Sequence, residues 1–360
     1  MGIRNKLLVL YTVNCSGHIA HAIGKRLRLA GLDVDVAGNE SCYDNQAMVD
    51  QLLRLSIHPN VGAVLAVGHG CEFIQAEKIV QYAKQHGRLA KAVYGQRLGT
   101  KKCLETGVET GRQLCRRIGR NMREETDCAG LTVGFTISAF DETVCHGLPI
   151  LETVCTHLTG NGVGIVLPER FLCGLNLKGI ETSLPSVAEL QKKAEHFYVG
   201  DELELPEEWK AHFGEYVMEK AAGYLKIAQI PRGPGLWFSD SLPDSGQEKG
   251  PVNGGIVSEL MQFVGNGAVL NLMLTGSGTP VGSAVAPTVI ITGNEETKRR
   301  MAEDVDLLVS PERGNAEELI DLICQVMGGK LTAPERNGQS QALLYQNEQN
   351  RRRCDECLER

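Results

Sequence analysis

Aromatic residues are scarce in this chain, long apolar runs are absent, and basic residues do not outnumber acidic ones. No stretch of about 18 apolar residues occurs, so we expect no membrane-spanning helix. Lysine and arginine number 37 against 44 aspartates and glutamates, and the net charge of −7 disfavours binding to nucleic acid or to an anionic membrane. Phe, Trp and Tyr supply 5% of the residues whereas glycine numbers 41, a balance that suits an enzyme whose loops approach ligands closely.

Several catalytic motifs are also missing. No G-x-G-x-x-G opens a helix after the first predicted strand, and neither G-x-S-x-G nor H-E-x-x-H occurs. A nicotinamide dehydrogenase and a serine hydrolase are therefore disfavoured. The first residues lead into a short apolar run without a small-residue cleavage site, which is unlike a signal peptide.

The chain contains twelve cysteines, yet it is neither short nor secretory in character. We therefore predict a cytoplasmic protein whose cysteines are mostly reduced. Enzymes of this size often form symmetric assemblies, so a homo-oligomer is also expected.

Apolar runs and helical spacings alternate along the first part of the chain. Strands are predicted at 6–11, 34–37, 61–67 and 92–94, and helices at 19–27, 46–55, 73–84 and 101–120. A charged stretch follows at 121–127, and a second alternating series then begins at 131. This pattern predicts the α/β class, with two Rossmann-like parallel-sheet domains.

We place the first domain at 1–128 and the second at 129–332. The second domain is predicted to contain strands at 131–136, 164–167, 269–274 and 288–292, helices at 150–158 and 316–327, and a mostly helical insert at 186–228. The remainder, 333–360, is predicted to be a polar tail.

Three cysteines each follow a predicted strand of the first domain. Cys15, Cys42 and Cys71 come shortly after the first, second and third strands. Because neighbouring parallel strands lie about 5 Å apart, residues at their carboxyl ends can converge. Thiolates bind soft metals and iron–sulfur clusters. The alternative interpretation is three independent buried thiols, because no tight C-x-x-C supports the group.

Other polar residues lie near these cysteines in the sequence. His18 and His69 are candidate members of the site, although a lone histidine is more often structural. Glu72 is either a base or a cap for the following helix. A separate C-x-x-C, Cys354 to Cys357, lies in the predicted tail and is a weak metal signal by itself.

A glycine-rich turn, 275–279, follows a predicted strand of the second domain. Its backbone N–H groups and hydroxyls can hold a carboxylate or phosphate, although an ordinary flexible turn explains the sequence equally well. It lacks the lysine of a P-loop, so nucleotide binding is disfavoured.

The order of these segments resembles that of the altronate and galactarate dehydratases, a family that includes the sulfolactate sulfo-lyase large subunit. The resemblance spans about residues 3 to 330. The stretches that carry it are 13–16, 58–65, 68–72, 99–102, 105–107, 235–240, 274–278, 292–294 and 303–306, with a looser match at 41–42.

This resemblance implies an iron-dependent lyase, with Fe²⁺ or a 4Fe–4S cluster, that removes a leaving group from a small hydroxy acid such as a sugar acid or a sulfonated hydroxy acid. The implied metal ligands are Cys15, Cys42 and Cys71, with Cys145 as a further candidate. The implied catalytic residues are Asp141, His69 and Glu72. The implied substrate-binding residues are Asn14, Ser16, Thr275, Gly276, Ser277 and Asn294.

The chain also departs from the family pattern. Where the family has Gln/Glu-Cys-Gly-Gly-Ser-Asp, residues 136–141 retain only Asp141. The small SAF-type domain of full-length members has no counterpart in this sequence, so it is either a separate partner subunit, as in split members of the family, or not needed. The alternative hypothesis is a catalytically divergent family member that serves as a binding or partner subunit.

Overall fold

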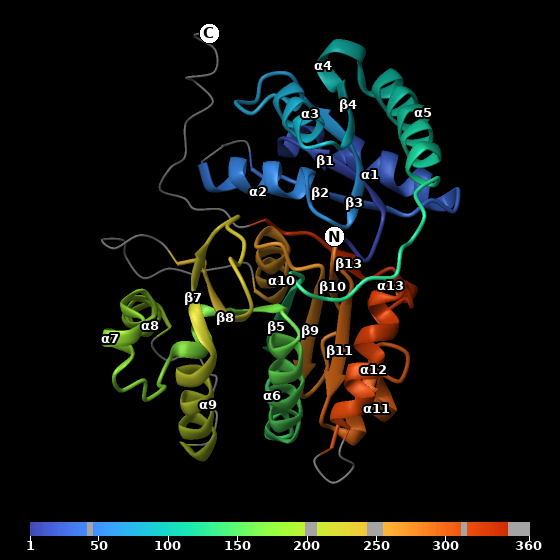
Figure 1. Cartoon of the computed structure of the whole chain (residues 1–360). Helices are drawn as coiled ribbons and strands as arrows, with labels where there is room; N and C mark the ends of the chain where they lie inside the picture. The colour runs from blue at the N-terminus through green and yellow to red at the C-terminus, as the bar shows by residue number, and fades with distance from the viewer. Residues whose placement is uncertain (42–45, 199–206, 243–254, 311–314, 345–360) are drawn as a thin grey trace. The chain divides into compact units, whose positions relative to one another are not determined.

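The computed structural model describes residues 1–41, 46–198, 207–242, 255–310 and 315–344. The chain forms two compact units. The first comprises Met1–Thr126 with Gln341–Arg360, and the second comprises Asp127–Ser340. Helices alternate with strands in both units, and the strands form parallel sheets, so the predicted α/β class is confirmed (Figure 1).

The first unit contains one four-stranded parallel sheet in the order β2-β1-β3-β4. Its elements are β1 (Lys6–Tyr11), α1 (Asn14–Leu29), β2 (Val34–Gly38), α2 (Gln46–Ser56), β3 (Val61–Gly68), α3 (Ala76–Gln85), β4 (Leu89–Tyr94), α4 (Gly95–Leu98) and α5 (Thr100–Ile118). β1 is a central strand, and its last residue, Tyr11, lies opposite Gly38 of β2 and Val67 of β3. The loops after these three strands therefore begin at the same edge of the sheet.

Helices cover both faces of this sheet, with α1 and α5 on one face and α2 and α3 on the other (Figure 1). All six residues of β1 are buried, and α1 turns Ile19, Ile23 and Leu27 toward the sheet. Burial on both faces explains why the strands are continuous apolar runs in the sequence.

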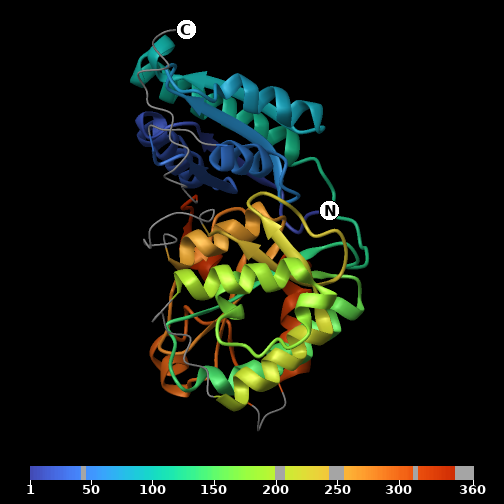
Figure 2. The same cartoon turned by 90° about the vertical axis from the view of Figure 1, so that its left-hand side faces the viewer.

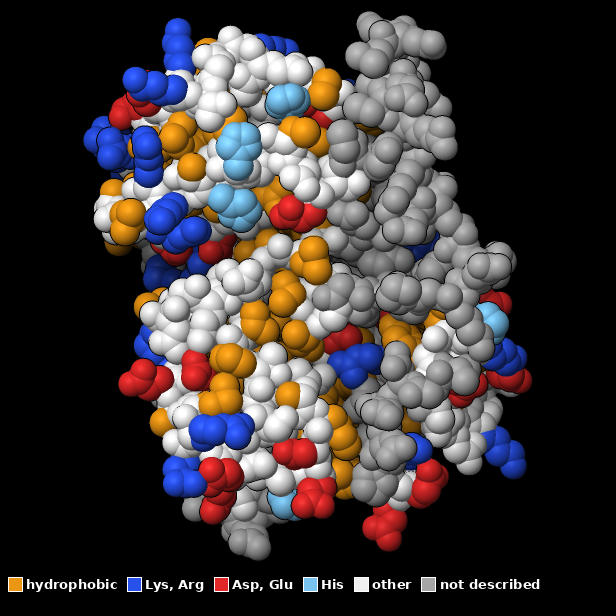
Figure 3. Space-filling view, turned by 180° about the vertical axis from the view of Figure 1, so that it is seen from behind, with side chains coloured by type: hydrophobic (Ala, Val, Ile, Leu, Met, Phe, Trp, Pro, Cys, Tyr) orange, Lys and Arg blue, Asp and Glu red, His pale blue; other side chains and the backbone are white. Residues whose placement is uncertain are grey.

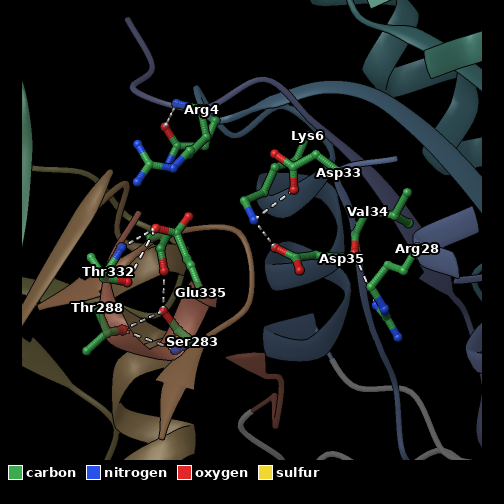
Figure 4. Close-up of polar contacts among 12 residues, drawn as sticks. Arg4, Lys6, Arg28, Asp33, Val34, Asp35, Ser283, Thr288, Thr332 and Glu335 are labelled. Carbon is green, nitrogen blue, oxygen red and sulfur yellow. Dashed lines mark hydrogen bonds and ion pairs between the residues drawn. The ribbon is translucent and has the colours of Figure 1, made fainter. Parts of the chain in front are cut away.

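A charged group lies at the opposite, amino-terminal edge of this sheet. The Lys6 ammonium is 3.2 Å from a carboxylate oxygen of Asp33 and 3.1 Å from one of Asp35 (Figure 4). Lys6 and Asp35 are buried, and their opposite charges compensate for the loss of hydration. The group joins the starts of β1 and β2.

The second unit contains a seven-stranded parallel sheet in the order β12-β11-β9-β5-β6-β8-β7. Its elements are β5 (Thr132–Ser138), α6 (Val144–Gly160), β6 (Gly164–Pro168), the 3₁₀ helix η1 (Glu169–Leu172), α7 (Ile180–Ser183), α8 (Pro185–Phe197), α9 (Glu207–Lys220), β7 (Ala221–Lys226), β8 (Gly235–Asp240), α10 (Ile256–Gly265), β9 (Leu270–Thr275), β10 (Gly282–Ser283), β11 (Thr288–Thr292), α11 (Glu295–Arg300), β12 (Leu307–Leu308), α12 (Ala316–Met327) and α13 (Ala333–Asn337). The short strands β10 and β13 (Ser340–Gln341) pair with each other.

The strand order of this sheet reverses at β5. The chain passes from β5 to β6 on one side, and β9 later returns to the other side. Ligands of parallel sheets commonly bind at the carboxyl ends of strands beside such a reversal. The loops after β5 and β9 therefore flank a favourable position for a ligand.

Apolar side chains fill both faces of the second sheet. Leu260 and Phe263 of α10 pack with Val166 of β6 and Met273 of β9, whereas α6 and α12 pack together on the opposite face. Figure 2 shows α7, α8 and α9 on the side of the unit that carries β7 and β8.

Four local predictions need correction. The segment 221–226, predicted as helix, is β7, because it pairs with β8 at the sheet edge. The apolar run of α10 was not predicted as a helix. The part predicted as a polar tail contains α13, which begins with a capping box between Thr332 and Glu335 (Figure 4). α3 begins at Ala76 instead of residue 73.

Candidate functional site

Two of the predicted metal ligands lie at the carboxyl edge of the first sheet. Cys15 is exposed in the first turn of α1, directly after β1. Cys71 is half-buried in the turn between β3 and α3. Cys42 lies outside the described residues. Because β1 and β3 are neighbours, the two described thiols occupy adjacent strand ends.

Two hydrogen bonds tie together the segments that carry these thiols. The Thr12 hydroxyl donates to Oε1 of Glu72 at 2.9 Å, and the Ser16 hydroxyl donates to the carbonyl oxygen of Val67 at 3.0 Å. Thr12 and Ser16 flank Cys15 in sequence, and Val67 and Glu72 flank Cys71. The segments around the two cysteines are therefore held side by side.

The Glu72 carboxylate organises the turn after β3. Its Oε1 accepts the N–H of His69 at 3.1 Å in addition to the Thr12 hydroxyl, and its Oε2 accepts the N–H of Gly70 at 2.6 Å. The residue is buried. The helix-cap interpretation of Glu72 is wrong, because α3 has Gln75 as its N-cap and Glu72 accepts amides that precede it.

A second carboxylate connects the end of β2 to β1. The Tyr11 hydroxyl donates to the Glu40 carboxylate, and the Asn14 side-chain amide donates to the Glu40 carbonyl oxygen at 2.8 Å. The N–H of Asn14 also donates to the carbonyl oxygen of Ser41 at 3.3 Å. Burial and the neighbouring Glu40 carboxylate raise the pKa of Tyr11. The backbone that leads toward Cys42 is thereby fixed as far as Ser41.

The remaining predicted residues of this unit differ in accessibility. Asn14 and His18 are exposed and His69 is half-buried, whereas Ser16 is buried and its hydroxyl donates to two carbonyl oxygens. Figure 3 shows histidine side chains on the surface of the first unit. Asn14 and His69 are thus better placed than Ser16 to contact a ligand.

The donor set at this edge fits a soft metal ion, because two thiols lie on neighbouring strand ends. The described part of the chain contains no group of three His, Cys, Asp or Glu side chains arranged around a common point. Cys42 does not belong to that part. An iron site on Cys15, Cys42 and Cys71 consequently stays a prediction.

In the second unit, predicted residues from three strand ends converge. Oδ2 of Asp141, after β5, accepts the side-chain amide of Asn294, after β11, at 3.2 Å. A Cβ added at Gly276, after β9, would lie 2.5 Å from the Asp141 carboxyl group, so only glycine fits there. These residues occupy the strand ends beside the reversal of strand order.

Several of these groups already have partners within the protein. Oδ1 of Asp141 accepts the N–H and the hydroxyl of Thr143, and Oδ1 of Asn294 caps α11 by accepting the N–H of Thr297. Their side chains are partly buried. They therefore also have structural roles that fix the loops after β5 and β11.

The glycine-rich turn uses some of its own hydrogen-bond donors. The N–H groups of Gly276 and Ser277 donate to the carbonyl oxygen of Ala139 at 3.1 and 3.0 Å. The Thr275 hydroxyl is buried, whereas Ser277 is exposed. A ligand at this turn would depend on the Ser277 side chain more than on these two amides.

Cys145 lies in the first turn of α6, close to Asp141 in sequence. Burial raises the pKa of its thiol, and the nearby Asp141 adds to the shift while a backbone hydrogen bond opposes it. Metal ligation requires the thiolate, so this environment makes Cys145 a weaker ligand than an unperturbed cysteine.

A buried charged cluster at the ends of β5 and β6 was not predicted from the sequence. Nε of Arg170 donates to Oε2 of Glu259 at 2.7 Å, and Nη2 donates to Oε1 of Glu259 at 3.0 Å and to the Thr136 hydroxyl at 2.8 Å. Glu169 accepts the hydroxyls of Tyr198 and Ser241. The signal was available, because Glu169 and Arg170 come just after the predicted strand 164–167, with only Pro168 between the strand and Glu169.

A groove in the described part of the second unit lies away from the predicted site residues. A groove of about 420 Å³ lies between α6 and α9 and is lined by Glu152, His212, Glu215 and Tyr216 among others. The His212 ring nitrogen Nε2 is 2.7 Å from the Glu152 carboxylate. None of the predicted site residues lines this groove, which therefore lies apart from the predicted site.

The described residues define an α/β protein with cysteine, histidine and carboxylate side chains at the carboxyl edges of parallel sheets. Two family models match the chain. The second domain of D-galactarate dehydratase/altronate hydrolase matches residues 1–119, and the C-terminal domain of D-galactarate/altronate dehydratase matches residues 217–350. The chain therefore belongs to the D-galactarate dehydratase/altronate hydrolase family, which confirms the resemblance found in the sequence.

Three named relatives are similar to nearly the whole chain. The (2R)-sulfolactate sulfo-lyase subunit beta of Chromohalobacter salexigens is 22% identical, over 96% of this chain and 94% of that protein. The altronate dehydratase of Escherichia coli is 25% identical over 96% of this chain and 76% of that enzyme. The altronate dehydratase of Bacillus subtilis is 24% identical over 96% and 75%, respectively.

Proposed function

We propose that this protein is a metal-dependent lyase that eliminates water or sulfite from a small hydroxy acid. The observation that carries the proposal is its membership of a dehydratase family, together with similarity to a sulfolactate sulfo-lyase subunit over 94% of that relative's length. Both named activities remove a leaving group from a hydroxy acid.

We assign metal binding to the first unit. Cys15, Cys42 and Cys71 would supply thiolates, with iron as the metal, either as Fe²⁺ or as a cluster. The bound metal would supply a Lewis acid for the leaving group. The support for this assignment is the position of Cys15 and Cys71 at neighbouring strand ends that hydrogen bonds hold together.

The reaction also needs a base next to the substrate carboxylate. His69 is our candidate in the first unit, because it is half-buried and lies two residues before Cys71 in the turn after β3. Asp141 is the candidate in the second unit, where the Asn294 amide donates to its carboxylate and Gly276 lies against it. Thr275 and Ser277, the neighbours of Gly276 in the chain, are the further candidates for substrate contact. In either case the base takes the proton from the carbon beside the carboxylate, the carbon–oxygen or carbon–sulfur bond breaks, and the resulting enol becomes a 2-keto acid.

Two features of the cellular context complete the proposal. We propose a small SAF-domain protein as a partner subunit, because one relative is itself named as a subunit beta. We also propose a cytoplasmic location, because the chain has twelve cysteines but is neither short nor secretory in character. The described chain has no helix long and apolar enough to cross a membrane.

Anaerobic purification followed by iron and sulfide analysis, and then by a substrate panel, tests this function. We expect bound iron and release of a 2-keto acid from a sugar acid or of sulfite from sulfolactate. Cys71→Ser should lose both the iron and the turnover, whereas Cys324→Ser, a change at an exposed cysteine of α12, should retain both. Unchanged iron content and turnover in Cys71→Ser would exclude the cysteine site.

A divergent, non-catalytic family member is the second candidate function. It is favoured by residues 136–141, where Asp141 is the only residue retained from the family pattern and both of its carboxylate oxygens already accept hydrogen bonds. Such a protein would bind a partner subunit yet release no 2-keto acid or sulfite from any acid of the panel, with or without added iron.

A further inference from the structure

The turn after β3 is held by a side chain instead of by regular secondary structure. We propose that Glu72 is a positioning residue whose carboxylate fixes the turn at 69–71 against the end of β1, so that Cys71 and Cys15 are presented together. The link to metal binding rests on the proposed function, whereas the anchoring of the turn does not.

The anchor consists of three hydrogen bonds to one buried carboxylate. Thr12 reaches Glu72 from the end of β1, and the amides of His69 and Gly70 reach it from the turn itself. Hydrogen bonds to an ionised acceptor are stronger than those between neutral groups. One side chain therefore links Thr12, the residue after β1, to the backbone of the turn.

The glycines of the turn make room for this anchor. A Cβ added at Gly68 would lie 2.7 Å from Oε1 of Glu72 and 2.3 Å from the Tyr94 ring. Gly70 has a φ of +134°, a conformation that other residues rarely adopt. The N–H of Gln96, in α4, donates to the carbonyl oxygen of His69 at 3.0 Å and so holds the turn from the side of α4. The sequence Gly68-His69-Gly70 is thus shaped to bring two amides to one carboxylate.

These contacts favour a positioning role for Glu72 over a role in proton transfer. Glu72 is 5% exposed, and both of its oxygens accept hydrogen bonds from the protein. A base must reach the proton that it removes. Glu72 instead acts on chemistry through the position of the His69–Cys71 backbone.

Three variants and two readouts test this proposal. Glu72→Gln replaces one carboxylate oxygen by an amide that cannot accept. Thr12→Val removes the hydroxyl that donates to Glu72, together with its weaker bond of 3.4 Å to the carbonyl oxygen of Val67. Glu77→Gln is the matched control, because Glu77 is an exposed carboxylate in the first turn of α3. The readouts are backbone hydrogen exchange of the purified chain and binding of cobalt(II) ions.

We expect Glu72→Gln to speed exchange of the amides at 69 and 70 about tenfold or more, with a smaller effect of Thr12→Val. Cobalt affinity should fall by about 10- to 100-fold in Glu72→Gln, because residues behind metal ligands have effects of that size. Glu77→Gln should match the wild type in both measurements.

The two readouts also keep this proposal apart from the proposed function. Wild-type exchange rates of the amides at 69 and 70 in Glu72→Gln would overturn the anchor. Loss of turnover with unchanged exchange rates and unchanged cobalt affinity would also overturn it, because that pattern is expected of a catalytic acid or base. Faster exchange in a chain whose wild type binds no cobalt would support the anchor and overturn the metal site. If Glu72→Gln does not fold, the same comparison with Thr12→Val decides.

Discussion

Glu169 is a buried carboxyl group that follows β6 directly and is 1% exposed. Burial raises its pKa from 4.5 to about 7, while hydrogen bonds from Ser241 and Tyr198 oppose the shift and the charge of Glu259 adds to it. Because the protonated form is favoured only in the folded chain, the folded state binds more protons than the unfolded state between these two pH values.

We predict that Glu169 makes the folded protein less stable as the pH rises. Its contribution to the free energy of unfolding is fully present below about pH 4.5 and is lost as the pH rises through about 7. The shift corresponds to at most about 3 kcal/mol. Denaturant unfolding at a series of pH values should show a smaller loss between pH 5 and 8 in Glu169→Gln than in the wild type.

The control for this measurement is Glu142→Gln, which changes an exposed carboxylate of the same unit. Its pH dependence should follow that of the wild type. A Glu169→Gln profile parallel to the wild-type profile would show that Glu169 does not titrate in this range.

At the scale of elements, the connection from β5 to α6 contains a strained residue. Ala139 has a φ of 44°, in the left-handed region that costs a non-glycine residue about 1–2 kcal/mol. Its carbonyl oxygen nevertheless accepts the amides of Gly276 and Ser277. The loop after β9 therefore holds the loop after β5 in this conformation.

We predict that Ala139→Gly stabilises the protein by up to about 1 kcal/mol, because glycine relieves the strain and loses only part of that gain to the greater freedom of the unfolded chain. The midpoint of denaturant unfolding measures the effect. Ala129→Gly is the control, since Ala129 is exposed and has no positive φ. It should destabilise the protein slightly, and equal effects of the two changes would argue against strain at Ala139.

Helices and strands with a clear pattern of apolar residues were predicted well from the sequence. β1 and β3 are continuous apolar runs, and α12 has an apolar stripe at helical spacing; the structure has all three where they were expected. β7 was mistaken for helix because its first residues, Ala-Ala-Gly, show no alternation of apolar and polar side chains that would indicate a strand. Only pairing with β8 makes it a strand.

At the scale of the whole molecule, the cysteines differ widely in exposure. Cys15 is exposed, whereas Cys103 and Cys155 are buried, and burial raises the pKa of Cys155 to about 12. The thiolate is the reactive form of cysteine, so burial and a raised pKa both lower the rate of reaction with a thiol reagent. The native chain should therefore react with thiol reagents in a definite order.

We predict that iodoacetamide alkylates Cys15 in the native, metal-free chain at least about tenfold faster than Cys103 or Cys155. Mass spectrometry of peptides after timed labelling measures the three rates. Iron loading should slow alkylation of Cys15 and Cys71 while leaving the exposed Cys324 unchanged, which makes Cys324 the internal control. Equal labelling of Cys15 with and without iron would contradict its role as a ligand.

The candidate site was predictable only in part. The positions of Cys15, Cys71, Asp141 and Asn294 at strand ends followed from the sequence, because a parallel sheet brings its strand ends to one edge. The partners of these residues did not follow. That Glu72 accepts the hydroxyl of Thr12, sixty residues away, depends on how the strands are ordered in the sheet.

The sequence by itself determined the α/β class, the apolar strands and the family, because burial and local spacing are encoded residue by residue. Only the tertiary structure decided the strand order, the turn of Glu72 toward β1, and the burial of Glu169 with Arg170 and Glu259. These features depend on contacts between residues far apart in the chain, and no local pattern specifies which of many polar groups will be neighbours once water is excluded.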